Sequence, residues 1–189
     1  QQLMTPPEQP LEFGSSTLGI IGCGSIGQEV ARQAGVFGTR ILYHNRSRLD
    51  ETVERRLGLE YSSFKDILGS SDVLSINVPL TDETRGMIGA EEIALMKKGA
   101  VLINTARGGI VNEQALADAL KSGHLRGAAV DVFENEQDIG VCPLIGLENV
   151  ILTPHSSALS PETLKRVPPK VMENLNRIYD GKPPLRVVN

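Results

Sequence analysis

The sequence predicts an α/β fold with a doubly wound parallel sheet, in which helices cover both faces, followed by a C-terminal helical tail. Two observations lead to this prediction. Short apolar runs alternate with longer segments of helical spacing between residues 17 and 154, and the length of 189 residues suits one domain with appendages. Strands that alternate with helices in this way pair in parallel and bury both faces of their sheet.

Six short apolar runs are the predicted strands. Most of them are nearly continuous in apolar and β-branched residues, which is typical of strands that are buried on both faces. In chain order the runs are TLGII (17–21), RILY (40–43), DVLSINV (72–78), AVLIN (100–104), GAAVDVF (127–133) and NVILTP (149–154).

The segments between these runs have apolar residues at helical spacing and residues that favour helix ends. The predicted helices are residues 25–37, ended by Gly38; 47–57, opened by a capping box of Ser47 and Asp50; 90–98; and 112–123, from the cap Asn112 to Gly123.

Both ends of the chain differ from this pattern. The opening QQLMTPPEQP is expected to be a linker, so residues 1–13 are assigned to a linker or tail, and the chain is expected to be a piece of a longer protein. Residues 14–158 form the predicted domain and 159–189 the helical tail. Ser160 and Pro161 begin the tail helix, Pro168 and Pro169 are expected to break or kink it, and helical spacing then resumes until about Gly181.

Composition narrows the classes of function. The chain is 40% hydrophobic and 22% charged with a formal net charge of −4, which disfavours nucleic acid and anionic membrane surfaces as partners. No apolar run is long enough to span a bilayer. Two cysteines, Cys23 and Cys142, suit neither a disulfide framework nor a metal site. We therefore expect a reducing, cytoplasmic location, with no metal.

The sequence GCGSIG follows the first predicted strand and opens the first helix. Gly22, Gly24 and Gly27 fit G-x-G-x-x-G, in which the glycines allow a tight turn, an approach of backbone to a pyrophosphate, and close packing of helix on strand. The first N–H groups of the helix, near Ser25 and Ile26, then face the phosphates. The motif predicts a dinucleotide site of the Rossmann type; the alternative is a structural glycine turn.

Three further motifs end strands at the edge where ligands bind in such sheets. Arg107 in NTARGG could clamp a carboxylate, or be an ordinary surface arginine. VDVFENEQ offers Asp131, Glu134 and Glu136, or else a solvated acidic loop. His155 in LTPHSSALS could be catalytic or structural. The occurrence of all three at successive strand ends favours the catalytic interpretation.

The order GxGxxG, NTARGG, VDVFENE, TPH resembles the nucleotide-binding domain of the D-isomer-specific 2-hydroxyacid dehydrogenases, from about Ser16 to the end of the chain. The resemblance implies that Arg107 binds and polarises a small 2-oxo acid, that Glu136 partners the histidine, and that His155 is the acid/base. It also implies a homodimer for the full-length protein. The positions that match cofactor contacts are Ser25, Ile26, Val78, Pro79, Thr105, Ala106, Arg107, Asp131, His155 and Ala158.

Three features depart from that family. Gln137 stands where a proline usually follows the glutamate, and Ser156 and Ser157 stand where a small pair such as Ile-Gly is common. The substrate-binding domain that largely precedes this region is absent, and the tail would return to it. Formate dehydrogenases are disfavoured because they typically carry glutamine at position 136, and phosphoglycerate dehydrogenases because their cofactor loop usually carries an aspartate.

The stretch YHNRSR follows the second strand, where an acidic side chain usually binds the ribose hydroxyls. Here Asn45 is neutral and Arg46, Ser47 and Arg48 follow it. An aspartate would repel a ribose 2′-phosphate, whereas arginines can bind one. The stretch therefore predicts a preference for NADP, with NAD as the other cofactor; the alternative is a basic surface loop indifferent to either. NRSR also resembles the loop of NADP-using glyoxylate and hydroxypyruvate reductases.

Two classes of function follow. The first is an NADP-preferring 2-oxo acid reductase of the glyoxylate/hydroxypyruvate type, although this piece alone is expected to be inactive. The second is a cofactor-sensing module without turnover, similar to the corepressors that resemble this family. The set Arg107, Glu136 and His155 favours the enzyme.

Overall fold

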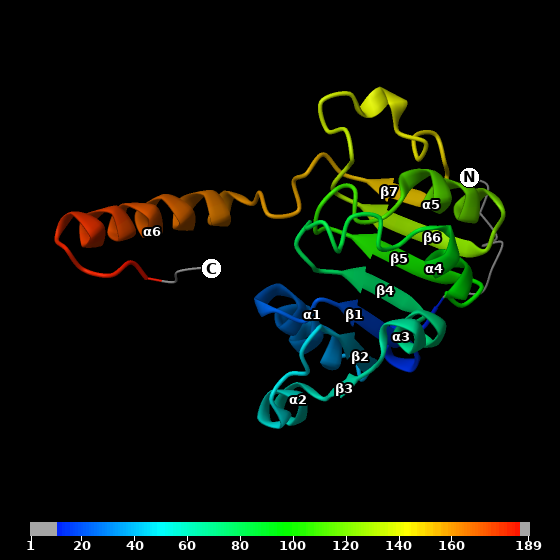
Figure 1. The fold of residues 1–189 in the computed structure, drawn as a ribbon, viewed down its shortest axis with the longest axis horizontal. Helices are drawn as coiled ribbons and strands as arrows, with labels where there is room; N and C mark the ends of the chain where they lie inside the picture. The colour runs from blue at the N-terminus through cyan, green and yellow to red at the C-terminus, as the bar shows by residue number, and fades with distance from the viewer. Residues whose placement is uncertain (1–10, 186–189) are drawn as a thin grey trace, which may run out of the picture. The chain divides into compact units, whose positions relative to one another are not determined.

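The computed structural model describes residues 11–185 of the chain. In this part of the protein seven strands, all paired in parallel, form one sheet with the order β3-β2-β1-β4-β5-β6-β7 (Figure 1). The strands are β1 (Thr17–Ile21), β2 (Arg40–His44), β3 (Leu59–Tyr61), β4 (Val73–Ile76), β5 (Ala100–Asn104), β6 (Leu125–Val130) and β7 (Val150–Leu152).

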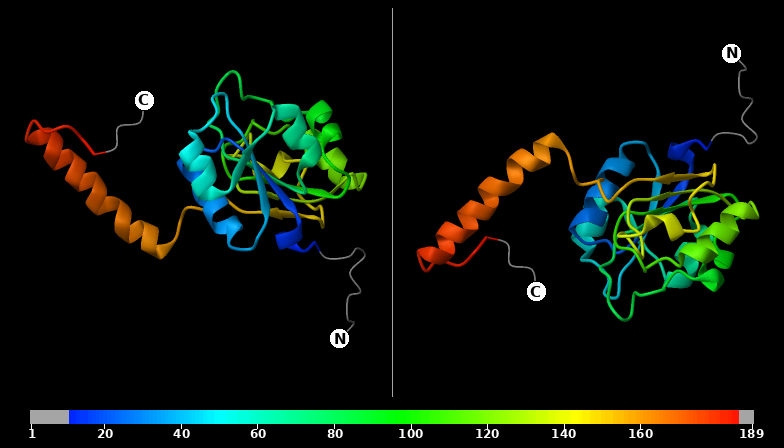
Figure 2. Two further views of the ribbon diagram at one scale, coloured as in Figure 1. Left: turned by 90° about the horizontal axis from the view of Figure 1, so that it is seen from below. Right: turned by 90° about the horizontal axis from the view of Figure 1, so that it is seen from above.

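Helices cover both faces of this sheet, as the left view of Figure 2 shows. Helices α1 and α2 pack together, whereas α3, α4 and α5 form a row in which each contacts the next. Buried side chains accordingly form two clusters, one with residues of α1 and one with residues of α3, α4 and α5. The helices are α1 (Ser25–Gly35), α2 (Glu51–Leu57), α3 (Phe64–Ser70), α4 (Ala90–Leu95) and α5 (Glu113–Lys121), with short 3-10 turns at Phe13–Ser15 and Ile139–Val141.

The inner strands are apolar because both of their faces lie beneath helices. Ile20 of β1, Leu74 of β4 and Leu102 of β5 are completely buried. Each such side chain contributes about 1.5–3 kcal/mol when it leaves water. This burial explains why these strands are continuous runs of apolar residues, rather than sequences in which apolar and polar residues alternate.

The chain divides into two compact units, the first ending at Pro154 and the second beginning at His155. The second unit contains α6 (Pro161–Tyr179), whose N-cap Ser160 accepts a hydrogen bond from the Thr163 N–H at 3.1 Å. This helix runs through Pro168 and Pro169 without interruption, so of the predicted break or kink the break is wrong and the kink stays a prediction. Its apolar residues keep one helical spacing on both sides of the prolines. Within residues 11–185, no helix is long and apolar enough to cross a membrane.

The predicted fold class is confirmed, and β1 and β5 have the predicted bounds. Two elements, β3 and α3, have no counterpart in the sequence prediction. The predicted capping box is wrong: α2 begins at Glu51, and Asp50 caps it by accepting the Thr52 N–H at 2.8 Å. Asp50 is adjacent to the first helical residue, whereas Ser47 lies too early in the chain and stays in the loop.

The strand order has a switch point between β1 and β4. The chain proceeds outward from β1 through β2 to β3, and then returns to place β4 on the other side of β1. Loops that follow β1 and β4 therefore diverge, and a crevice opens at the carboxyl ends of these strands, which is where ligands bind in open parallel sheets.

Candidate nucleotide-binding and catalytic site

The glycine-rich turn after β1 has the geometry that a dinucleotide site requires. Gly22 has φ +89°, and a Cβ at this position would lie 2.7 Å from the carbonyl of Asn77. A Cβ on Gly27 would lie 2.5 Å from the Gly22 carbonyl oxygen, so only glycine lets α1 pack so close to β1. Gly24 differs from both, because nothing lies within 4 Å of its Cβ position. Its backbone faces open space, which leaves room for a pyrophosphate.

The N-terminus of α1 adjoins this open space. The N-cap Gly24 supplies no side-chain cap for the first turn of α1, which begins at Ser25. The partial positive charge of a helix N-terminus favours phosphate. Ile26 in the same turn is exposed although it is apolar. Ser25 and Ile26 therefore lie in the first turn of α1, next to the open space at Gly24, and their contacts with a cofactor stay a prediction.

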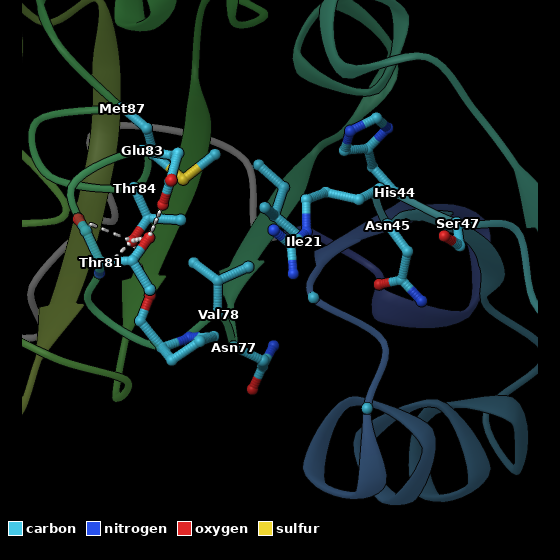
Figure 3. Close-up of a pocket in the computed structure, with 14 residues that line it drawn as sticks. Ile21, His44, Asn45, Ser47, Asn77, Val78, Thr81, Glu83, Thr84 and Met87 are labelled. Carbon is cyan, nitrogen blue, oxygen red and sulfur yellow. Dashed lines mark hydrogen bonds between the residues drawn. The ribbon is translucent and has the colours of Figure 1, made fainter. Parts of the chain in front are cut away.

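A cavity of about 430 Å³ lies at the switch point (Figure 3). Asn45 and Ser47 lie on one side of it, and Thr81, Glu83 and Thr84 lie on the other. Of the predicted cofactor residues it includes Gly22, Gly24, Asn45, Arg46, Ser47, Val78 and Pro79. The lining residues that the sequence analysis missed are Ile21, His44, Asn77, Thr81, Glu83, Thr84 and Met87. The segment VPLTDETRGMI (78–88) carries four of them, and its position directly after β4 is the signal that could have found them.

Asn45 is held by the glycine-rich turn. Its Oδ1 accepts a hydrogen bond from the Cys23 backbone N–H at 2.6 Å. Because an N–H group can donate only to the oxygen of the amide, this bond fixes the orientation of the side chain. The Nδ2 group of Asn45 is then the part of the amide that remains for other partners, and it is a hydrogen-bond donor. Asn45 is one of the residues that line the cavity.

The two arginines of the loop have different surroundings. Arg46 lines the cavity. Arg48 is absent from the cavity lining and pairs with Glu54 of α2, with Nε 2.8 Å from Oε1 and Nη2 2.8 Å from Oε2. Glu83, across the cavity, accepts a hydrogen bond from the Thr81 hydroxyl at 2.6 Å, and this bond, with a smaller contribution from Arg46, lowers the pKa of its carboxyl. The cavity thus carries one guanidinium of the predicted pair.

The arginine loop after β5 is shaped by Asn104. Asn104 is buried, its Oδ1 accepts the Ala106 N–H and its Nδ2 donates to the Arg107 carbonyl, both at 3.1 Å. The Arg107 side chain is exposed and donates from Nη1 to the Ala106 carbonyl at 2.7 Å. Thr105 lies in the same turn and is exposed. The loop therefore presents Arg107 from a fixed backbone at the carboxyl edge of the sheet.

The carboxylate loop after β6 packs directly on the arginine loop. A Cβ on Gly108 would lie 1.9 Å from the Phe133 carbonyl oxygen, so the two backbones touch. Glu113 of α5 accepts the Glu134 N–H at 2.7 Å and ties the loop to that helix. Asp131 is buried and accepts the Thr153 hydroxyl at 2.6 Å, whereas Glu136 is exposed. The first unit thus brings together the loops that carry Arg107 and Glu136.

His155 and Ala158 belong to the second unit, and both are exposed. His155 has φ +51° and is the one non-glycine residue with positive φ among the described residues. A left-handed backbone is uncommon for a residue other than glycine, although histidine adopts it more often than most residues, and such conformations cluster at functional sites. The backbone thus marks His155 as a special position independently of its motif.

Comparisons with known proteins agree with this geometry. Residues 4–157 match the family model of the D-isomer specific 2-hydroxyacid dehydrogenase, NAD binding domain. A glyoxylate reductase of Aeropyrum pernix is 48% identical over 179 residues, which cover 95% of this chain and 53% of the relative. The chain therefore spans about half the length of the relatives that it matches.

Solved structures give the same result. The crystal structure of a glyoxylate reductase from Paecilomyes thermophila matches with a TM-score of 0.83 and 42% identity, over 91% of this chain and 52% of that one. The structure of a D-lactate dehydrogenase with NAD+ from Lactobacillus jensenii matches with a TM-score of 0.86 and 29% identity, over 95% of this chain and 57% of that one.

Proposed function

This chain belongs to the D-isomer-specific 2-hydroxyacid dehydrogenase family as its NAD-binding domain, and from this membership we propose that it is the cofactor-binding half of a reductase of small 2-oxo acids. We further propose that the enzyme is of the glyoxylate/hydroxypyruvate type and prefers NADP to NAD. The similarity to glyoxylate reductases over nearly the whole chain supports the substrate class.

The orientation of Asn45 carries the proposed cofactor preference. Because its Oδ1 is used by the Cys23 N–H, the polar group that Asn45 retains for a ligand is a donor. An N–H donor can bind the oxygens of a ribose 2′-phosphate. An aspartate at this position would instead offer a second carboxylate oxygen, which would accept hydrogen bonds from the ribose hydroxyls and repel the phosphate. Arg46 lines the same cavity and can add a charge-assisted hydrogen bond to the phosphate.

The proposed chemistry assigns one task to each catalytic residue. When bound, the reduced nicotinamide supplies a hydride to the carbonyl carbon of the substrate. Arg107 binds the substrate carboxylate and stabilises the charge that develops on the carbonyl oxygen. In this proposal His155 gives a proton to that oxygen, and Glu136 is the carboxylate partner of the histidine. The 2-oxo acid gains one hydride and one proton and becomes the 2-hydroxy acid.

The proposal includes a cytoplasmic location and a homodimeric full-length protein. Both cysteines are buried free thiols, which fits a reducing compartment.

Burial raises the pKa of the Cys23 thiol to about 11. Cys23 therefore stays protonated at neutral pH and is poorly reactive although it lies in the phosphate turn.

The decisive experiment compares cofactors and substrates in the full-length parent protein. Turnover is measured on a panel of 2-oxo acids with NADPH and with NADH. Reduction of glyoxylate or hydroxypyruvate with a higher kcat/KM for NADPH supports the proposal. Cofactor binding without turnover of any 2-oxo acid would contradict it and favour a cofactor-sensing module.

A further inference from the structure

We propose that Tyr43, Arg48 and Glu54 form a clamp that positions the cofactor loop, and that Arg48 serves this clamp instead of binding the phosphate itself. The cofactor loop comprises residues 45–50, between β2 and α2. The identity of the ligand rests on the NADP preference proposed above. The clamp itself is built from side chains of β2, the loop and α2.

The centre of the clamp is a buried carboxylate. Glu54 lies in α2 and is 7% exposed. It accepts two hydrogen bonds from Arg48, both 2.8 Å long, and a third from the Tyr43 hydroxyl. The bonds from Arg48 and then Tyr43 lower the pKa of Glu54 to about 2. Glu54 is therefore ionised at neutral pH, and its charge is compensated by the arginine of the loop.

Tyr43 extends the clamp to the backbone of the loop. Its side chain is completely buried on β2, and its hydroxyl oxygen accepts the Leu49 N–H at 2.9 Å. The Arg48 guanidinium also lies over the Tyr61 ring, with Cζ 5.8 Å from the ring centroid. The clamp thus fixes both a side chain and a backbone group at the C-terminal end of the loop.

The other end of the loop is anchored as well. Asn45 accepts the Cys23 N–H at 2.6 Å. Two residues, Arg46 and Ser47, lie between this anchor and the clamp, and both are exposed and line the cavity. A loop that is fixed on both sides of two residues presents those two residues in a defined position, which is what preorganised binding requires.

Charge separates the roles of the two arginines. Arg48 directs its Nε and Nη2 groups at an ionised carboxylate. A phosphate brought to the same guanidinium would be repelled by Glu54. Arg46 lines the cavity and has no such carboxylate in hydrogen-bonding contact among the described residues. Arg46 is therefore the cation that meets the phosphate, and Arg48 is a positioning residue.

The test uses the whole 189-residue chain and two variants of the clamp. Tyr43→Phe removes the hydroxyl without changing any charge, and we expect it to weaken NADPH binding by about 3- to 10-fold, the scale of one lost hydrogen bond, with little change for NADH. Arg48→Lys keeps a charge that can bind phosphate but cannot form two parallel bonds with Glu54. We expect it to resemble Tyr43→Phe, and Arg46→Ala to cause a larger loss for NADPH.

A second measurement follows the loop without any cofactor. Hydrogen exchange of the Leu49 amide should accelerate in Tyr43→Phe, because its acceptor is removed. The matched control is Arg40→Lys, since Arg40 forms a similar two-bond pair with Glu60 at the opposite end of β2. This control should leave both cofactor affinities and the exchange of Leu49 unchanged.

The outcomes separate the clamp from the cofactor preference. If Arg48→Lys and Tyr43→Phe both bind NADPH as tightly as the wild type, and the Leu49 amide exchanges at the wild-type rate, the clamp is refuted. Direct binding of the phosphate by Arg48 would then be the supported interpretation. Equal affinity of the wild type for NADPH and NADH would overturn the cofactor preference alone. In that case faster Leu49 exchange in Tyr43→Phe still supports the clamp, and unchanged exchange refutes it.

Discussion

Two asparagines at strand ends show how the same side chain serves different purposes. Asn104 uses its oxygen on the Ala106 N–H and its nitrogen on the Arg107 carbonyl, so its amide is committed to its own loop. Asn45 uses its oxygen on the Cys23 N–H and is also one of the residues that line the cavity. Asn104 is thus a structural residue, and Asn45 joins structure to recognition.

The first prediction at this scale concerns Asn45 and Arg46. The double variant Asn45→Asp, Arg46→Ile retains an acceptor for the Cys23 N–H, adds a carboxylate oxygen for the ribose and removes a cation. We expect the preference to change from NADPH to NADH, starting from a wild-type preference of at least about tenfold. The preference is measured as the ratio of the calorimetric dissociation constants for NADPH and NADH. The measurement is made at two ionic strengths, because salt screens exposed charges and should reduce a preference that depends on them.

The second prediction concerns the catalytic residues in the full-length enzyme. His155→Ala removes the proton donor and should lower kcat by about 10²–10⁴. Arg107→Ala should impair substrate KM and turnover together, while the dissociation constant of NADPH changes little. Steady-state kinetics with both variants test this assignment; intact turnover in His155→Ala would show that the histidine is structural.

Sequence reasoning worked for residues whose role is set by local backbone geometry. The distinct environments of Gly22, Gly24 and Gly27 are those that the motif predicts. The different surroundings of Arg46 and Arg48 were not foreseeable, because they depend on α2 placing Glu54 beside Arg48. Two arginines that are close in the sequence look equivalent until the structure shows which of them has a charged partner in another element.

At the scale of elements, close backbone contacts position the chemistry. The loop after β5 and the loop after β6 touch where Gly108 meets Phe133. Glu113, in the first turn of α5, holds the second of these loops through the Glu134 N–H. The loop of Arg107 is therefore positioned by its neighbour as well as by its own strand.

Gly108→Ala tests this contact. Its Cβ would meet the Phe133 carbonyl oxygen at 1.9 Å, so the two backbones must separate. We expect a loss of stability of about 1–3 kcal/mol from overpacking and a strong loss of turnover in the full-length enzyme, with NADPH affinity nearly unchanged. Gly123→Ala is a useful comparison for stability, because it lies in open space with φ +70° and so adds backbone strain without a contact. Equal turnover in Gly108→Ala and wild type would refute the role of the contact.

Long elements with a strong apolar pattern were predicted, whereas two short elements were not. β1 and β5 lie inside the sheet and read as apolar runs. β3 is a three-residue edge strand of which only Leu59 is buried, and α3 has seven residues. β3 depends on its pairing with β2, which its own sequence does not show. α3 does carry a local signal, the N-cap Ser63, which accepts the Asp66 N–H and which the sequence prediction did not use.

At the scale of the whole molecule, the described residues hold a seven-stranded sheet and a second compact unit, and the chain spans about half the length of its relatives. We predict that these 189 residues bind NADPH with an affinity within about tenfold of the full-length protein, yet reduce 2-oxo acids hardly at all. The physical reason is that the glycine turn and cavity are present, whereas the cleft that orients a substrate needs an opposing surface.

Calorimetry with NADPH and a glyoxylate-reduction assay on the same preparation check both halves of this prediction. Robust reduction of glyoxylate by the chain alone would contradict it. A chain that fails to bind either cofactor would contradict the dinucleotide site itself.

The strand order also has a consequence for how the protein can evolve by recombination. The residues proposed to select the cofactor follow β2, on one side of the switch point, and those proposed to perform the chemistry follow β5 and β6, on the other, with His155 beyond them. A recombination event that exchanges the segment from β2 to α2 would replace the loop together with its clamp and leave the catalytic loops untouched. Under the proposed assignment, such an exchange would change the cofactor preference in one step and leave the proposed catalytic residues in place.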